Sequence, residues 1–137
     1  MTTLSFYRTV METSGEKSRE TAKRATGSVF HALRDRLTHE EADQVVDQLP
    51  RDLKDVWEAG EKKERRPLKL NREEFYDRVK RETGVASKRE ARWLTLAVFA
   101  ALKEQLSPGE AEDVYSQLPK DLKEVWAEAQ AEVEARR

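Results

Sequence analysis

The chain repeats itself after 69 residues, and this internal repeat limits its fold more than any other feature of the sequence. A shift of 69 positions places Phe6-Tyr7 on Phe75-Tyr76 and Val56-Trp57 on Val125-Trp126, without a gap between the two matches. Eight of the ten aromatic residues fall at paired positions. Because chance does not align so many residues, the sequence predicts a tandem duplication of one small unit.

Each repeat is predicted to form four helices. The chain contains five Gly, four Pro and no Ile, and it is rich in Ala, Leu, Glu, Lys and Arg, which is typical of helices rather than strands. Residues 42–49 place Ala, Val, Val and Leu at the i, i+3, i+4, i+7 spacing of an amphipathic helix. We therefore expect an all-α fold, a pseudo-symmetric duplication with repeats at residues 1–66 and 67–137 in one joint globular domain.

Capping residues mark the expected helix ends. Asn71 with Glu74, and Ser87 with Glu90, have the spacing of a capping box, in which two side chains satisfy free N–H groups reciprocally. The other expected ends are N-caps at Ser18, Thr38 and Ser107 and left-handed C-terminal residues at Gly15 and Gly84.

The second helix differs between the repeats. Residues 93–102 are apolar almost all round, whereas residues 24–31, which match residues 93–100, include Arg, Gly, Ser and His. A helix that is apolar on all sides is usually buried, so residues 93–102 are expected to form the central helix of a joint core. The alternative is an exposed patch of Trp93, Leu94 and Leu96 that binds a partner.

One motif of the sequence resembles a known family. It runs from Glu110-Ala111 through Gln117-Leu118-Pro119 to Trp126, with a copy from Glu41-Ala42 to Trp57. The pattern resembles the prokaryotic family of domains of unknown function called DUF2267, and the resemblance covers nearly the whole chain. It implies duplicated, small, all-helical units. It implies no activity, no cofactor and no site residues, because the family has none assigned.

Composition excludes several classes of function. Cysteine is absent, which excludes disulfides, thiolate metal sites and cysteine nucleophiles. The net charge of −1 argues against a nucleic-acid coat protein, and no apolar stretch is long enough for a membrane span. The first residues lack the features of a secretory signal, so a cytoplasmic location is expected. Phosphate-binding loops and zinc-protease motifs are absent, so we expect no enzyme activity, cofactor or metal.

Three residues have the spacing of an incomplete metal site. His31, Asp35 and His39 would share one face of a continuous helix, and imidazole and carboxylate groups are common metal ligands. Thr38, however, is expected to be an N-cap that interrupts this helix. We therefore interpret the two histidines as ordinary surface residues.

Two pairs of repeated residues also allow two interpretations. Gln48 and Gln117 could contact a ligand, but they are expected to satisfy free N–H groups at a tight helix junction. Trp57 and Trp126 could anchor a partner, but their apolar neighbours favour a place in the core.

Positive charge is concentrated in the middle of the chain. Residues 61–90 contain eleven Lys or Arg and seven Asp or Glu, which leaves +4, whereas residues 1–60 carry −2 and residues 91–137 carry −3. Clustered cations are sufficient for phosphate contacts. The candidate contacts are Lys62, Lys63, Arg65, Arg66, Arg89 and Arg92. The alternative is a charged linker and solvated helix faces that pair with the acidic flanks.

The sequence leaves three classes of function open. The first is a non-enzymatic, cytoplasmic interaction or assembly protein that binds an unknown protein or a second copy of itself, with no membrane contact. The second is weak nucleic-acid association through residues 62–92. The third is an enzyme or small-ligand binder at the seam between the repeats.

Overall fold

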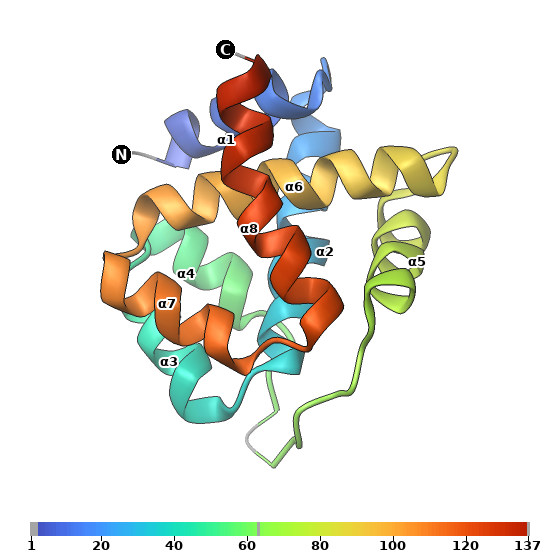
Figure 1. Ribbon diagram of the computed structural model, residues 1–137. Helices are drawn as coiled ribbons and strands as arrows, with labels where there is room; N and C mark the ends of the chain where they lie inside the picture. Colours follow the sequence, from blue (N-terminus) through green and yellow to red (C-terminus); the bar gives the residue numbers. More distant parts are fainter. Residues whose placement is uncertain (1–2, 63, 137) are drawn as a thin grey trace.

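The computed structural model describes residues 3–62 and 64–136, and this part of the chain forms eight helices and no strand (Figure 1). The helices are α1 (Thr3–Ser14), α2 (Arg19–Arg36), α3 (His39–Asp47), α4 (Arg51–Glu58), α5 (Arg72–Thr83), α6 (Lys88–Gln105), α7 (Pro108–Gln117) and α8 (Lys120–Arg136). The all-α expectation is therefore confirmed. Each of these eight helices is too short or too polar to cross a membrane.

The helices begin and end close to the expected capping residues. Asn71 and Glu74 form the expected capping box at the start of α5. Gly15 and Gly84 have φ angles of 79° and 76°, which only glycine adopts without strain. Ser87 also caps α6, but its expected box with Glu90 is wrong, because the Glu90 carboxylate accepts from the backbone N–H of Ala86 instead.

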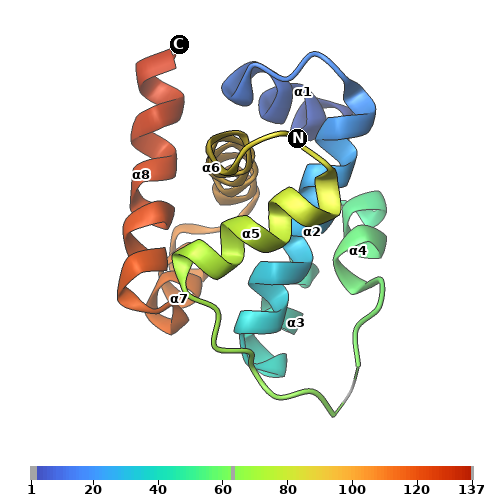
Figure 2. The ribbon, with the colours of Figure 1, turned by 90° about the vertical axis from the view of Figure 1, so that its right-hand side faces the viewer.

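Helix α6 occupies the middle of the molecule. It packs against α1, α2, α5 and α8, and Figure 2 shows it end-on with α8 on one side and α2 on the other. Every residue of α6 from Leu94 to Leu102 is buried. The expectation of a central, buried second helix is confirmed. Burial on all sides also explains its apolar sequence.

Two clusters of three aromatic rings lie inside the core. Phe30 contacts Phe6 and Trp57 at ring-centroid distances of 5.6 and 5.3 Å. Phe99 contacts Phe75 and Trp126 at 5.7 and 5.2 Å. Trp57 and Trp126 are 2% and 3% exposed, which confirms their interpretation as core residues.

The two halves of the chain pack into one hydrophobic core. Helix α1 contacts α6 more extensively than it contacts α2, and α5 contacts α2 more extensively than α6. Helices α3 and α7 also meet across the halves (Figure 1). The buried apolar residues of both halves form a single cluster. Neither half therefore covers its own apolar faces alone.

Candidate functional site

The cations of the basic segment do not form one surface. Lys62 and Arg66 are exposed in the segment that joins α4 to α5, whereas Arg89 is exposed at the start of α6. Helix α5 separates these two places (Figure 2), and its 12 residues span about 18 Å. Lys63 lies outside the described residues.

Two of the candidate phosphate contacts are held by internal partners. Arg65 is 10% exposed, and its guanidinium donates to Glu61 Oε1 at 2.7 Å and to the backbone oxygen of Leu37 at 2.8 Å. Arg92 forms an ion pair with Glu128. These acidic partners compete with any phosphate for the two guanidinium groups. At Arg65 and Arg92 the structure shows the pairing with acidic side chains that the alternative interpretation describes.

A buried arginine, Arg34, holds the end of α4 beneath this segment. Its Nη1 donates to the backbone oxygens of Trp57 at 2.7 Å and Ala59 at 2.8 Å. Asp35 pairs with Arg34 and also with Arg78 from α5, at 3.1 Å. Sequence reasoning missed this network, because no local pattern identifies an arginine that binds helix carbonyls at a distance of more than twenty residues.

Lys103 makes the matching contact on α8. Its Nζ donates to the backbone oxygen of Trp126 at 2.8 Å and lies 5.5 Å from the centre of the Trp126 ring. Burial lowers the pKa of this amine below its ordinary value. Positions 34 and 103 are 69 residues apart, like the tryptophans whose carbonyl groups they bind.

The segment between α4 and α5 presents a fixed but exposed leucine. The N–H of Leu68 donates to the backbone oxygen of Asp35 at 2.7 Å, yet its side chain is 48% exposed. Lys62, Arg66 and Lys69 are exposed beside it, together with one acidic residue, Glu64. We call Lys62, Arg66, Leu68 and Lys69 the linker surface. Three of its members line a cavity of about 260 Å³, which is also bordered by Arg34, Asp35, Glu61 and Arg65.

The residues of the alternative partner patch at the start of α6 do not form an exposed apolar surface. Leu94 is 3% exposed and Leu96 is fully buried, so two of its three members belong to the core. Trp93 is half-buried, and the Arg92 guanidinium lies 5.4 Å from the centre of its ring. The alternative of an exposed patch at Trp93, Leu94 and Leu96 therefore loses two of its three residues to the core, because α6 is surrounded by other helices.

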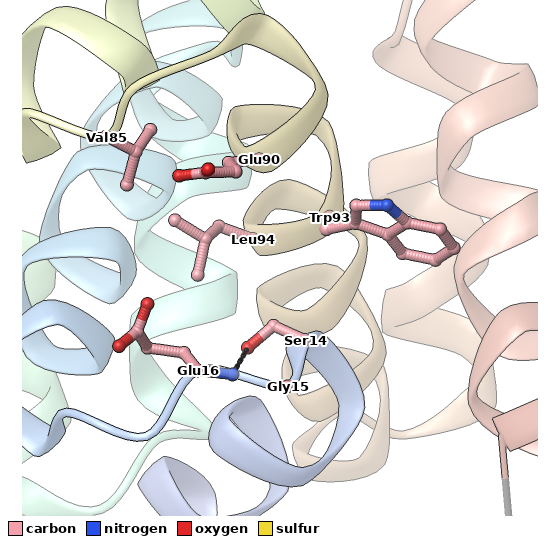
Figure 3. Close-up of a pocket in the computed structure, with 7 residues that line it drawn as sticks. All are labelled: Ser14, Gly15, Glu16, Val85, Glu90, Trp93 and Leu94. Carbon is pink, nitrogen blue, oxygen red and sulfur yellow. Dashed lines mark hydrogen bonds between the residues drawn. The ribbon is translucent and has the colours of Figure 1, made fainter.

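A cavity of about 270 Å³ lies where the α1–α2 and α5–α6 loops approach each other (Figure 3). Leu94 points into it, whereas the Trp93 ring points away toward α8. Its two carboxylates, Glu16 and Glu90, accept hydrogen bonds from backbone N–H groups of their own loops, at 2.9 and 3.3 Å. These acids therefore stabilise the loops, and the residues lining the cavity do not pair a nucleophile with a base.

The structure separates the three residues with metal-like spacing. His31 Nε2 lies 2.7 Å from the backbone oxygen of Val56, whereas His39 begins α3 and its Nδ1 is 3.9 Å from the Glu61 carboxylate. Thr38 is the N-cap between them, as expected. The two imidazoles therefore have different partners and do not converge on one ion.

The junction of α3 and α7 is held by two glutamines, each of which caps the helix of the other half. Gln48 Oε1 accepts from the backbone N–H of Ser107 at 2.7 Å, and Gln117 Oε1 accepts from that of Thr38 at 3.1 Å. These are the N-cap residues of α7 and α3. The interpretation of both glutamines as partners of free N–H groups is confirmed, and the groups they satisfy lie across the seam.

Three acidic side chains meet inside this junction. Glu41 and Glu110 are 6% and 7% exposed, and each follows its N-cap residue by three positions. One oxygen from each of Glu41, Glu110 and the exposed Asp113 lies within 4.8 Å of the others. Burial raises the pKa of Glu41 to about 8, with the hydrogen bond and charge of Glu110 as the next causes.

Sequence reasoning aligned Glu41 with Glu110 as the first residues of the family motif and its copy, but gave them no role in a site. The backbone N–H groups of both residues do bind the N-cap hydroxyls of Thr38 and Ser107, each at 3.2 Å. Their carboxylates turn inward instead of closing capping boxes. The sequence does contain a sign of this arrangement. Glutamate occupies this position in both repeats, whereas most of the other positions that are identical in the two repeats are apolar.

The sequence matches a known protein family over most of its length. A family model described as an uncharacterized conserved protein, DUF2267, matches residues 3–125. No curated protein matches the sequence.

Proposed function

The chain belongs to the DUF2267 family, and on this premise we propose that it is a non-enzymatic interaction protein whose linker surface binds an acidic, partly apolar segment of a protein partner. The observation that carries this proposal is Leu68. Its backbone is fixed to α2 by a hydrogen bond, while about half of its side chain stays in contact with water. Burying an exposed leucine side chain releases roughly 1 kcal/mol or more.

Charge defines the partner that this surface fits. Lys62, Arg66 and Lys69 outnumber Glu64 among the exposed charges around Leu68. Arg65 also lines the adjoining cavity, but its guanidinium is already paired there with Asp35 and Glu61, so the exposed cations carry the charge of this surface. The complementary segment therefore carries acidic side chains beside an apolar one.

The same chemistry favours a protein over a nucleic acid. Phosphate binding needs only clustered cations, and an exposed leucine adds nothing to it. Of the candidate contacts on α6, Arg89 is separated from the linker surface by α5 and Arg92 is paired with Glu128. Nucleic-acid association through residues 62–92 is thus the alternative that the experiment below must distinguish.

The proposal also includes how the fold is organised. We take the chain to be a tandem duplication of a four-helix unit and place it in the cytoplasm of a prokaryotic cell. The 69-residue match, the contacts of α1 with α6 and of α5 with α2, and the reciprocal glutamines support the duplication. The lack of cysteine suits a reducing compartment.

The test combines capture and direct binding. Tagged protein is cross-linked in its native cells, purified after nuclease treatment, and the cross-linked segment is identified and made as a peptide. We expect an acidic peptide whose binding weakens with salt, because exposed charges are screened. Arg66→Glu and Leu68→Ala are each expected to weaken binding about tenfold, which corresponds to roughly 1.4 kcal/mol.

Arg89→Glu is the matched control, because Arg89 is an exposed arginine outside the linker surface. It is expected to bind the peptide as the wild type does. Capture that disappears with nuclease would favour the nucleic-acid alternative. A captured segment without acidic residues, equal binding by all variants, or no capture at all would contradict the proposal.

A further inference from the structure

We propose that Glu41, Glu110 and Asp113 bind a divalent, oxygen-preferring cation between α3 and α7. The site is independent of the linker surface, because it lies between two other helices and shares no residue with that surface. Its ligands come from both halves of the chain, so a bound ion joins them. No other group of three candidate ligands is found among the described residues.

The spacing of the three oxygens suits such an ion. They lie within 4.8 Å of one another. Calcium binds carboxylate oxygens at about 2.4 Å, so two oxygens on opposite sides of one ion are about 4.8 Å apart. Three oxygens at the full 4.8 Å from one another surround a central point at about 2.8 Å, so the carboxylates must close in by a few tenths of an ångström to bind calcium. Magnesium binds at shorter distances and requires them to close in further.

Two of the ligands have buried oxygens without partners. Glu41 Oε1 and Glu110 Oε1 are inaccessible to water, and when both carboxyl groups are ionised neither atom has a hydrogen-bond partner among the described residues. Leaving a buried carboxylate oxygen unpaired is costly, and native proteins normally satisfy such groups. A cation between the two carboxylates supplies the missing partner for both atoms.

The surrounding structure holds these ligands in place without neutralising them. The N-cap hydroxyls of Thr38 and Ser107 bind the backbone N–H groups of Glu41 and Glu110. Glu40 adds further negative charge near Glu41. None of the ion pairs found among the described side chains involves Glu41, Glu110 or Asp113.

Asp113 connects the buried pair to solvent. Its side chain belongs to an exposed residue, whereas Glu41 and Glu110 are buried. An ion can therefore enter on the Asp113 side and retain water at the coordination positions that the protein leaves open, as these cations commonly do. Three carboxylates and no nitrogen or sulfur ligand favour calcium, manganese or magnesium over zinc or copper.

Cation binding is tested on the full chain after treatment with a chelator. Calcium, manganese and magnesium chlorides are titrated at pH 7.5 by calorimetry, and thermal unfolding is followed at each concentration. We expect one ion per chain and a melting temperature that rises with ion concentration, because a ligand that binds the folded state stabilises it. Manganese electron paramagnetic resonance gives a direct count of bound ions on the unaltered protein.

Isosteric substitutions locate the site. Glu41→Gln and Glu110→Gln each remove one ligand charge and are expected to weaken binding at least about tenfold, the scale typical of perturbing a metal site. Asp113→Asn is expected to weaken it as well. Glu112→Gln is the matched control, because Glu112 is an exposed neighbour on α7 outside the cluster. It is expected to bind the ion like the wild type.

Several outcomes would overturn the proposal. One is the absence of bound manganese and of any thermal shift at millimolar ion concentrations. Another is an equal shift produced by sodium chloride at the same ionic strength, which would indicate screening of surface charge. Binding that persists unchanged in both glutamine variants would place the ion elsewhere. In these cases Glu41 and Glu110 bind a proton between them and no divalent cation.

Discussion

At the scale of single residues, Glu41 links folding to pH. The fold raises the pKa of this carboxyl from 4.5 to about 8, mainly through burial and then through Glu110. The folded state therefore binds the proton more tightly than the unfolded state does. The resulting stability is fully present below pH 4.5 and is lost as pH rises through about 8.

The first prediction concerns how stability changes with pH, given that the pKa of Glu41 is higher in the folded state than in the unfolded state. In the presence of a chelator, the free energy of unfolding is expected to fall between about pH 5 and pH 8, by at most about 1.4 kcal/mol per pH unit for one proton. Urea unfolding across this range measures it. Glu41→Gln cannot titrate and should flatten the curve. An identical pH dependence in the wild type and this variant would show that other groups cause it.

The second prediction concerns Gln48 and Gln117. Replacing either by alanine removes the acceptor for a backbone N–H on the opposite half, and each change is expected to cost about 1 kcal/mol of unfolding free energy. Chemical denaturation measures this cost. Gln44→Ala on the exposed face of α3 is the control and should change stability by less than about 0.5 kcal/mol. Equal effects at all three positions would indicate a general loss of helix stability.

At the scale of helices, α6 occupies the centre of the core, so truncating its side chains is expected to lower the free energy of unfolding most. The third prediction is that Leu96→Ala lowers the free energy of unfolding by roughly 2–5 kcal/mol, because Leu96 is fully buried and its loss leaves a cavity. Leu4→Ala on α1 is the comparison, since Leu4 is 59% exposed, and it should cost less than about 0.5 kcal/mol. A small effect at Leu96 would mean that α6 is not the centre of the core.

Helices were predictable because their signals are local. The hydroxyl of Thr38 or Ser107 and the left-handed Gly84 act within one turn of the helices they start or end. The apolar run of α6 likewise identified its burial. Prediction from the sequence failed where two backbone N–H groups compete for one side chain. The Glu90 carboxylate accepts from the N–H of Ala86 rather than from the N–H of Ser87, the N-cap residue.

The candidate site was less predictable than the helices, because it depends on contacts between distant parts of the chain. Arg65 and Arg66 are neighbours in sequence, yet one is paired internally and the other faces solvent. Glu41 and Glu110 are far apart in sequence and meet only because α3 and α7 pack together. Periodicity predicts which face of a helix is buried, but not which helix covers it.

At the scale of the whole molecule, each half depends on the other. Helix α1 packs more on α6 than on α2, and α5 packs more on α2 than on α6, so a separated half exposes apolar surface that the other half covers. The fourth prediction is that fragments 1–66 and 67–137 are each poorly helical in isolation. Mixed together, they are expected to regain helix in a manner that depends on their concentration. Circular dichroism measures both effects, and a fully helical single fragment would contradict the prediction.

The segment between α4 and α5 keeps the two halves of the molecule together when the protein is dilute. It joins two halves that would otherwise have to find each other by diffusion, and its hydrogen bond from Leu68 to α2 keeps it against the first half. A short tether of this kind gives the second half an effective concentration in the millimolar range. A cell can therefore hold very few copies of this protein, and each copy remains fully assembled.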